Sequence, residues 1–282
     1  MFTALSPGAI GVSTPTLEDR ISAAKTGGFE GVEIDPNEIA QRGGLVCRNI
    51  MAAAGIKPAG WGIPFDWRGS EEAWHSGLES FREQVKACAD LDCLRVITWI
   101  MPASNDLEFE ANYRYHINRL KPVADILAEY GGSLGLEYIG PKTLRDQFKY
   151  PFIWTAGDML EMGREIGQNV GLLVDCWHWY TSGGTSDALR MLAAQDVVYV
   201  HINDAPVGVA VDKQVDNVRC LPLETGVIDL EGFLAAIKAT GYQGPVIPEP
   251  FKQSLYELPS DKARLAALAG PMAEVKKILL AS

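Results

Sequence analysis

The sequence predicts an α/β fold in which eight strands alternate with helices and close into a single (β/α)8 barrel. Short β-branched apolar runs alternate with longer segments of helical period along the whole chain, and these runs number eight. No G-x-G-x-x-G motif follows the first run, which argues against an open nucleotide-binding sheet. Barrels of this class often form one domain of about 250 residues. We therefore expect residues 1–282 to form one domain.

The eight apolar runs give the expected barrel strands. Several of them are almost continuously apolar, which is typical of parallel strands that are covered on both faces. The expected strands are residues 2–5, 31–35, 57–62, 94–100, 133–139, 170–176, 197–203 and 245–249.

Start and stop signals for helices lie between these strands. A capping sequence at residues 16–19 predicts the start of the first helix, and Gly27 with Gly28 predicts its end. The longest segment without a periodic pattern is residues 204–229, after the seventh strand. Loops that follow barrel strands lie on the catalytic face, so we expect this segment to be a lid or a binding loop.

Composition excludes several classes of partner. The net charge of -11 disfavours nucleic acids and anionic lipid surfaces and favours a small neutral molecule. No run approaches the roughly 18 apolar residues of a membrane span, and no leader pattern is seen. We expect a cytoplasmic protein with no membrane or nucleic-acid partner, and a homo-oligomer is compatible with the sequence.

The five cysteines are odd in number and form no C-x-x-C pair, so we expect reduced thiols. Cys176 lies in the most informative motif of the chain. As a nucleophile it would need exposure and a neighbouring base, so we interpret it as a structural residue.

Four ionisable residues stand at or near the carboxyl ends of four consecutive predicted strands. Each one interrupts an apolar run: Glu137, Asp175, His201 and Glu249. Any one alone could be structural, because a buried glutamate can pair with an arginine and a core histidine can bond a carbonyl. Four on neighbouring strands, about 4.8 Å apart, can converge on one ion that offsets the desolvation of the carboxylates.

The donor set predicts the kind of metal. Three carboxylates and one imidazole, without a thiolate, favour a hard or borderline divalent ion. Mn²⁺ is the first choice, with Mg²⁺, Co²⁺ and Zn²⁺ as alternatives. Four protein ligands leave coordination positions open for substrate oxygens, as a catalytic metal requires.

At these residues the chain resembles the xylose-isomerase-like sugar isomerases and epimerases, a TIM-barrel family, and within it the 2-keto-myo-inositol isomerases and ketose 3-epimerases. The matching stretches are residues 136–140, 173–178, 200–204, 226–230 and 248–251. The likeness is strongest over residues 133–251 and rests mainly on strand and helix order before them.

The resemblance implies roles for six residues. Glu137, Asp175, His201 and Glu249 correspond to the metal ligands, and Glu137 and Glu249 to the acid and base that exchange a proton with the substrate. His178 and Arg219 match positions that bind substrate oxygens. Residues 222–226 read Pro-Leu-Glu-Thr-Gly where the family often has Pro-Gly-Glu-Gly, so this loop is expected to differ.

Other residues are weaker candidates for the site. Four tryptophans near predicted strand ends could offer flat walls to the C–H faces of a sugar, with core packing as the alternative for each: Trp61, Trp99, Trp177 and Trp179. Among them Trp61 is taken as a substrate contact, and so is Glu33 at the end of the second strand. Asp204 and Arg219 could equally form an ordinary surface ion pair.

The expected function is a metal-dependent isomerase or epimerase of a keto-sugar or keto-inositol that works through an enediolate. A lyase on the same scaffold, either a dehydratase or an enzyme that cleaves 3-keto-glycosides, is the first alternative. A non-catalytic sugar-binding barrel is the second. DNA repair is disfavoured, because His75 and His116 fall in predicted helices rather than at a multi-zinc site. The segment 250–254 has no glycine for a phosphate, which favours an unphosphorylated substrate.

Overall fold

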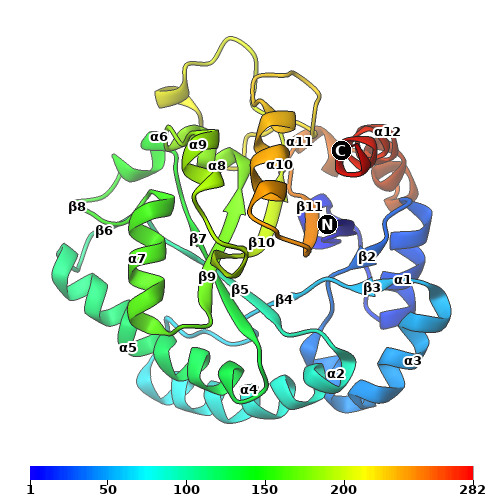
Figure 1. Cartoon of the computed structure of the whole chain (residues 1–282), viewed down its shortest axis with the longest axis horizontal. Helices are drawn as coiled ribbons and strands as arrows, with labels where there is room; N and C mark the ends of the chain where they lie inside the picture. Colours follow the sequence, from blue (N-terminus) through cyan, green and yellow to red (C-terminus); the bar gives the residue numbers. More distant parts are fainter. Residues whose placement is uncertain (282) are drawn as a thin grey trace.

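A computed structural model describes residues 1–281 and has the expected barrel at its centre (Figure 1). Parallel strands form one curled sheet in the order β3-β2-β1-β11-β10-β9-β7-β5-β4. The barrel strands are β1 (Phe2–Leu5), β2 (Gly31–Val32), β3 (Lys57–Pro58), β4 (Trp61–Gly62), β5 (Arg95–Ile100), β7 (Ser133–Tyr138), β9 (Val170–Asp175), β10 (Val197–Ile202) and β11 (Pro245–Pro248).

The two ends of this sheet belong to one stretch of chain. β3 pairs with β2, whereas β4 pairs with β5, and only Ala59 and Gly60 separate β3 from β4. The main chain at Gly60 still accepts a hydrogen bond from Ile34 N at 3.1 Å. Residues 57–62 therefore act as one barrel strand that closes the sheet on itself, and the prediction of eight barrel strands is confirmed.

Helices surround the strands (Figure 1). Their bounds are α1 (Leu17–Thr26), α2 (Pro36–Arg42), α3 (Gly44–Ala54), α4 (Glu71–Leu91), α5 (Phe109–Ala128), α6 (Lys142–Arg145), α7 (Ala156–Ile166), α8 (Cys176–Thr181), α9 (Ser186–Arg190), α10 (Leu230–Ala239), α11 (Gln253–Tyr256) and α12 (Asp261–Leu280). α1 begins as predicted, because Thr16 and Asp19 form a capping box. His75 lies in α4 and His116 in α5, as expected.

Two details were not predicted from the sequence. β6 (Ala103–Ser104) and β8 (Tyr150–Pro151) form a small antiparallel pair outside the barrel. The short helix α8 begins directly after β9, with the Asp175 side chain accepting a hydrogen bond from Trp177 N at 2.8 Å. Because no turn separates β9 from α8, Asp175 and His178 stay close to each other.

The core has two parts. The larger cluster joins the sheet to the helices, and a smaller one is formed by Phe2, Ala4, Ala59, Leu173, Tyr199 and Ile247. Tyr199 of the smaller cluster packs edge-on against His201, with ring centroids 5.6 Å apart. The smaller cluster therefore supports the site from below.

The segment after β10 follows an irregular course, as expected. It rises above the barrel (yellow in Figure 1) and contains one short 3-10 turn, η3 (Val211–Lys213), and a bridge between Asp204 and Cys220. Its cysteine and the other four are all free thiols. Within residues 1–281, no helix combines the length and apolar character that crossing a bilayer demands.

Candidate metal centre

The four predicted ligands come together at the carboxyl ends of neighbouring strands. Glu137 lies in β7, Asp175 ends β9, His201 lies in β10, and Glu249 follows β11. The strand register places His201 directly beside Asp175. One potential ligand atom from each of the four residues lies within 4.8 Å of the others. The spacing matches the convergence expected from the sequence.

The local sequence explains why these side chains face one another. His201 Nδ1 lies 3.6 Å from Glu137 Oε1 and 3.3 Å from Glu249 Oε2. Glu249 stands between two prolines that end β11, and its main-chain N–H still bonds Ile202 O at 2.9 Å. The glutamate is thus held at the rim of the barrel, while Asp175 below it is fully buried.

Buried polar atoms in this group lack partners. Glu137 Oε1 and both ring nitrogens of His201 are buried and accept or donate no hydrogen bond among the described residues. Such orphaned groups are rare in folded proteins unless something else satisfies them. The chemistry and the convergence of these donors fit a divalent cation.

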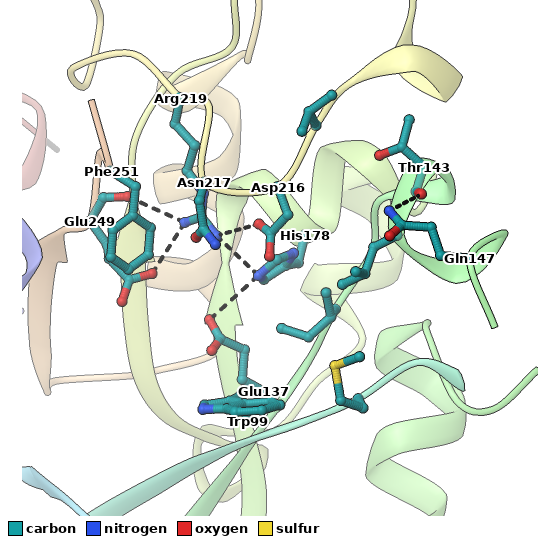
Figure 2. Close-up of a pocket in the computed structure, with 14 residues that line it drawn as sticks. Trp99, Glu137, Thr143, Gln147, His178, Asp216, Asn217, Arg219, Glu249 and Phe251 are labelled. Atoms are coloured by element: carbon teal, nitrogen blue, oxygen red, sulfur yellow. Dashed lines mark hydrogen bonds and ion pairs between the residues drawn. The ribbon is translucent and has the colours of Figure 1, made fainter. Parts of the chain in front are cut away.

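Arg219 binds the same group from above (Figure 2). Its Nη1 donates to Asp175 Oδ2 at 2.6 Å and to Glu249 Oε2 at 3.1 Å, and its Nη2 donates to Asp216 Oδ1 at 3.1 Å. The arginine is 4% exposed, so it is not the surface ion pair considered as an alternative. Arg219 lies in the loop after β10, and the fold of this loop brings its side chain to Asp175 and Glu249.

Charge and burial shift the ionisation of these groups. Burial, assisted by Glu249, raises the pKa of Glu137 to about 7. The pKa of Asp175 falls despite its burial, because Arg219 and His178 favour the charged carboxylate. The pKa of His201 rises well above its ordinary value, because the carboxylates of Glu249 and Glu137 outweigh its desolvation.

His178 is held as a neutral imidazole. Burial lowers its pKa to about 4. Its Nδ1 accepts a hydrogen bond from Gly140 N at 3.1 Å. Its Nε2 lies 3.2 Å from Arg219 Nη2, a group that can only donate, and 3.8 Å from Glu137 Oε1 at the wall of the cavity. His178 Nε2 therefore faces both the guanidinium of Arg219 and the space of the cavity.

A cavity of about 530 Å³ opens above the cluster (Figure 2). Its polar side is built by Glu137, His178, Asp216, Arg219 and Glu249. Its apolar side is lined by Trp99, Met101, Ile139, Leu144, Val215 and Phe251, and Thr143, Gln147 and Asn217 complete it. The site can bind a molecule that is polar along one edge and apolar along another.

Two candidates from the sequence lie elsewhere. Trp61 is 1% exposed, packs on Phe81 and donates from Nε1 to Cys93 O at 3.0 Å, so it belongs to the core and not to the cavity wall. Glu33 accepts a hydrogen bond from Tyr199 OH at 3.0 Å and is not among the residues that line the cavity, although its carboxylate interacts electrostatically with His201 and Glu249. Trp61 is therefore a core residue, and a substrate contact by Glu33 stays a prediction.

Of the other tryptophans, Trp177 and Trp179 are buried, and Trp99 lines the cavity. Asp204 is buried as well, and its carboxylate binds main-chain N–H groups of the loop. Cys176 is buried and its thiol donates to Asn203, while burial raises its pKa well above the ordinary value. A thiol in this state is a structural residue, as interpreted from the sequence.

Several functional positions were missed in the sequence. Asn203 Nδ2 donates to Asp175 Oδ1 at 2.9 Å and orients this carboxylate. Asp216, Asn217 and Phe251 lie on loops that carry no periodic signal. Asn203 could have been noticed, because it is a polar residue two positions after His201, directly beyond the end of β10.

Sequence and structure relate this chain to known proteins. A family model described as "Xylose isomerase-like TIM barrel" matches residues 21–270. The chain belongs to this family. Among solved structures, a xylose isomerase domain protein from Alicyclobacillus acidocaldarius is 29% identical and aligns with a TM-score of 0.83 over 99% of both chains.

Curated relatives of this xylose-isomerase-like chain are enzymes. Inosose isomerase of Bacillus subtilis (strain 168) is 24% identical over 214 residues, which span 74% of this chain and 72% of the relative. The 3-dehydroshikimate dehydratase of Pseudomonas putida is 27% identical over 252 residues, 87% of this chain but 38% of that longer protein. The chain is thus an enzyme of the sugar isomerase/epimerase-like family.

Two further structures share the fold. The IOLI protein with a bound zinc atom is 19% identical with a TM-score of 0.76 over 98% of both chains. D-psicose 3-epimerase in the presence of D-fructose is 17% identical with a TM-score of 0.72 over 99% of both chains. These two structures show the shared fold, and in the present chain a site for a divalent metal is supported by its own four-residue cluster.

Proposed function

We propose that the chain is a divalent-metal-dependent isomerase or epimerase of an uncharged keto-sugar or keto-inositol. The observation that carries the proposal is the cluster of Glu137, Asp175, His201 and Glu249, whose ligand atoms lie within 4.8 Å of one another beside a cavity of about 530 Å³. The inosose isomerase relatives and the ketose epimerase structures support the substrate class.

The protein residues supply the proton chemistry of this reaction. A bound divalent ion would supply Lewis-acid polarisation of the substrate carbonyl. Glu137 and Glu249, on either side of His201, are proposed to remove a proton from the carbon next to the carbonyl and return one, through an enediolate. The guanidinium of Arg219 is proposed to donate to substrate oxygens, and His178, whose Nε2 lies 3.2 Å from Arg219 Nη2, is proposed to bind a substrate oxygen beside it.

The charge of the cavity favours a neutral substrate. Among the described residues that line it, Arg219 is the sole cation, and it is already bound to the carboxylates of Asp175, Glu249 and Asp216. Even with a divalent ion bound, the four carboxylates of Glu137, Asp175, Asp216 and Glu249 outnumber the three positive charges of the ion and Arg219, so a substrate carboxylate or phosphate would meet no surplus of positive charge. This balance supports a keto-inositol or ketose over an anionic substrate.

A lyase is the second candidate, because the chain is also related to a 3-dehydroshikimate dehydratase. Loss of water would begin with the same proton removal by Glu137 or Glu249. Since 3-dehydroshikimate carries a carboxylate, the charge of the cavity makes this reaction the less favoured one.

The test combines metal replacement with a panel of substrates. Protein stripped by a chelator and reloaded with Mn²⁺, Mg²⁺, Co²⁺ or Zn²⁺ is incubated with 2-keto-myo-inositol, D-fructose, a 3-keto-glucoside and 3-dehydroshikimate. Mass-neutral products from the first two support the proposal. Loss of water or of an aglycone identifies the lyase, and equal turnover in metal-free protein contradicts the metal dependence. Mn²⁺ is expected to restore the highest activity, and a cytoplasmic location stays a prediction.

A pair of variants separates catalysis from binding. Glu249→Gln is expected to lower kcat on the order of a thousandfold, since it removes an acid/base group and weakens the metal site. Glu257→Gln makes the same chemical change at an exposed residue and should keep full activity. If Glu249→Gln leaves every detected activity unchanged while the ligand still binds, the chain is a sugar-binding barrel.

A further inference from the structure

An arginine outside the cavity is stacked between two indole rings. The guanidinium carbon of Arg68 lies 3.9 Å from the ring centroid of Trp67 and 4.0 Å from that of Trp99. Trp99 lines the catalytic cavity, whereas Arg68 and Trp67 do not. Arg68 thus connects a buried ring to a ring of the active-site wall.

The two indoles are held to different degrees. Trp67 is 1% exposed, and its Nε1 donates to Thr98 Oγ1 at 3.0 Å. It also packs edge-on against the His116 ring, with centroids 5.6 Å apart. Trp99 is 46% exposed, so the surrounding core encloses much less of it. Stacking on Arg68 therefore links the partly exposed ring of Trp99 to the buried ring of Trp67.

The charge of Arg68 is directed at these rings. In the described part of the chain no carboxylate forms an ion pair with its guanidinium, although Asp66 Oδ1 accepts from its main-chain N–H at 3.1 Å. Its Nη2 donates to the main-chain carbonyl of Trp99. A planar guanidinium can stack on two aromatic faces at once, which a lysine ammonium cannot do.

The position of Trp99 gives this stack a functional meaning. The register of β5 and β7 places Trp99 directly opposite Glu137, the proposed acid/base and metal ligand. Figure 2 shows the indole below the Glu137 side chain, whose carboxylate points toward His178. A flat ring in this place can contact the C–H face of a polyol whose carbonyl lies near the Glu137 carboxylate.

We propose that Arg68 is a positioning residue that holds the Trp99 indole as a fixed wall of the cavity and thereby sets the affinity for the uncharged polyol substrate. The second part of this inference rests on the proposed function. Arg68 acts through Trp99 and does not touch the substrate itself.

The first experiment needs no substrate. Protein labelled with 5-fluorotryptophan gives one fluorine resonance for each of its seven tryptophans, and Trp99→Phe assigns the resonance of Trp99. Trp154 packs under Arg145 at 3.7 Å and serves as the reference ring, assigned by Trp154→Phe. Arg68→Met should shift or broaden the Trp99 resonance and leave that of Trp154 in place. An unchanged Trp99 resonance in Arg68→Met would overturn the proposal. If Arg68→Met does not fold, Arg68→Lys takes its place, because it keeps the charge and loses the planar stack.

The second experiment measures kinetics with Mn²⁺ and 2-keto-myo-inositol. Arg68→Met should raise KM on the order of fivefold to tenfold with kcat nearly unchanged, and Arg68→Lys should raise it less. Arg119→Lys is the matched control for Arg68→Lys. The guanidinium carbon of Arg119 lies 4.8 Å from the ring centroid of Trp74, and neither residue lines the cavity. The KM of Arg119→Lys should therefore equal that of the parent.

A double-mutant cycle separates positioning from general stability. If Arg68 acts through Trp99, Arg68→Met should have no further effect on KM in a Trp99→Phe background. Additive effects, or a fall in kcat without a rise in KM, would contradict the proposal. A parent protein that does not turn over 2-keto-myo-inositol would count against the proposed function only, because the fluorine resonance of Trp99 still decides whether Arg68 holds the ring.

Discussion

Asp175 Oδ2 and Glu249 Oε2 share one partner, Nη1 of Arg219, at 2.6 and 3.1 Å. These carboxylates are also two of the proposed metal ligands, so the arginine partly balances them. Three ligand carboxylates, one guanidinium and one divalent ion sum to zero formal charge, and Asp216, bonded to Arg219 Nη2, adds one negative charge at the rim. A buried site of this kind avoids the large desolvation penalty of an unbalanced charge.

Metal affinity should depend on pH through Glu137. Its pKa in the metal-free protein is about 7, raised mainly by burial, and only the deprotonated carboxylate can bind a metal. The apparent affinity for Mn²⁺ should therefore rise as the pH increases from about 6 to about 8, with release of protons on binding. Titration calorimetry in buffers of different ionisation enthalpy measures both quantities. An affinity that stays flat over this range would contradict the proposed ligand role of Glu137.

Cys176 should be dispensable for catalysis. Its thiol is buried and bonded to Asn203, so Cys176→Ala should keep kcat within about threefold of the parent and lower the free energy of unfolding by about 1–2 kcal/mol. Steady-state kinetics and urea unfolding check the two effects. Loss of activity in a folded variant would contradict the structural interpretation of Cys176.

At the residue scale, the sequence was most informative where a polar residue interrupts an apolar strand. That signal found the four clustered residues, because their cost inside a core demands compensation. It could not decide whether Trp61 points into the barrel or outward, since neighbouring residues of a strand face opposite sides. Trp61 packs outward on Phe81 of α4, whereas the neighbouring Gly60 approaches Tyr199 of the smaller cluster.

Among the elements, the loop after β10 is organised by a single carboxylate. Asp204 Oδ1 accepts from the main-chain N–H groups of Ala205 and Ile228, and Oδ2 accepts from those of Thr225 and Gly226, at distances of 2.8 to 3.0 Å. The start and the end of the loop are joined in this way. The sequence predicted a long loop here but not its course, because such contacts leave no periodic pattern.

Removal of this carboxylate should loosen the loop. Asp204→Ala leaves four N–H groups without their acceptor, so the free energy of unfolding should fall by about 3 kcal/mol or more. Because Arg219 lies on the same loop, kcat/KM should fall as well. Hydrogen exchange over residues 205–228 locates the change, and Asp212→Asn, an exposed residue of the loop, serves as control. Unaltered exchange in Asp204→Ala would show that other contacts hold the loop.

For the whole molecule, closure of the barrel depends on residues 57–62. The sequence predicted this strand as one run, and the structure interrupts its pairing at Ala59 and Gly60, where the chain passes from β2 to β5 as partner. The count of eight units distinguished a closed barrel from an open sheet. The close approach of Gly60 to Tyr199, a distant residue in the sequence, could not be inferred from local pattern.

Gly60 should tolerate no side chain. A Cβ there would lie 2.6 Å from Tyr199 Cε2 and 2.8 Å from Arg95 O, so Gly60→Ala should lower the free energy of unfolding by roughly 1–3 kcal/mol. Gly157→Ala in α7 is the matched control, since its Cβ meets nothing within 4 Å and should stabilise the helix slightly. Thermal unfolding compares the two variants. Equal melting temperatures would mean that the closing strand can shift to make room.

The carboxylate at the base of the long loop has a consequence for engineering. Since Asp204 fastens both ends of the loop to one point, the intervening residues 206–218, which include the cavity-lining Val215, Asp216 and Asn217, can be exchanged as one cassette. Exchange of that cassette between relatives, with both fastened ends kept, offers a direct way to redirect which molecules the enzyme accepts.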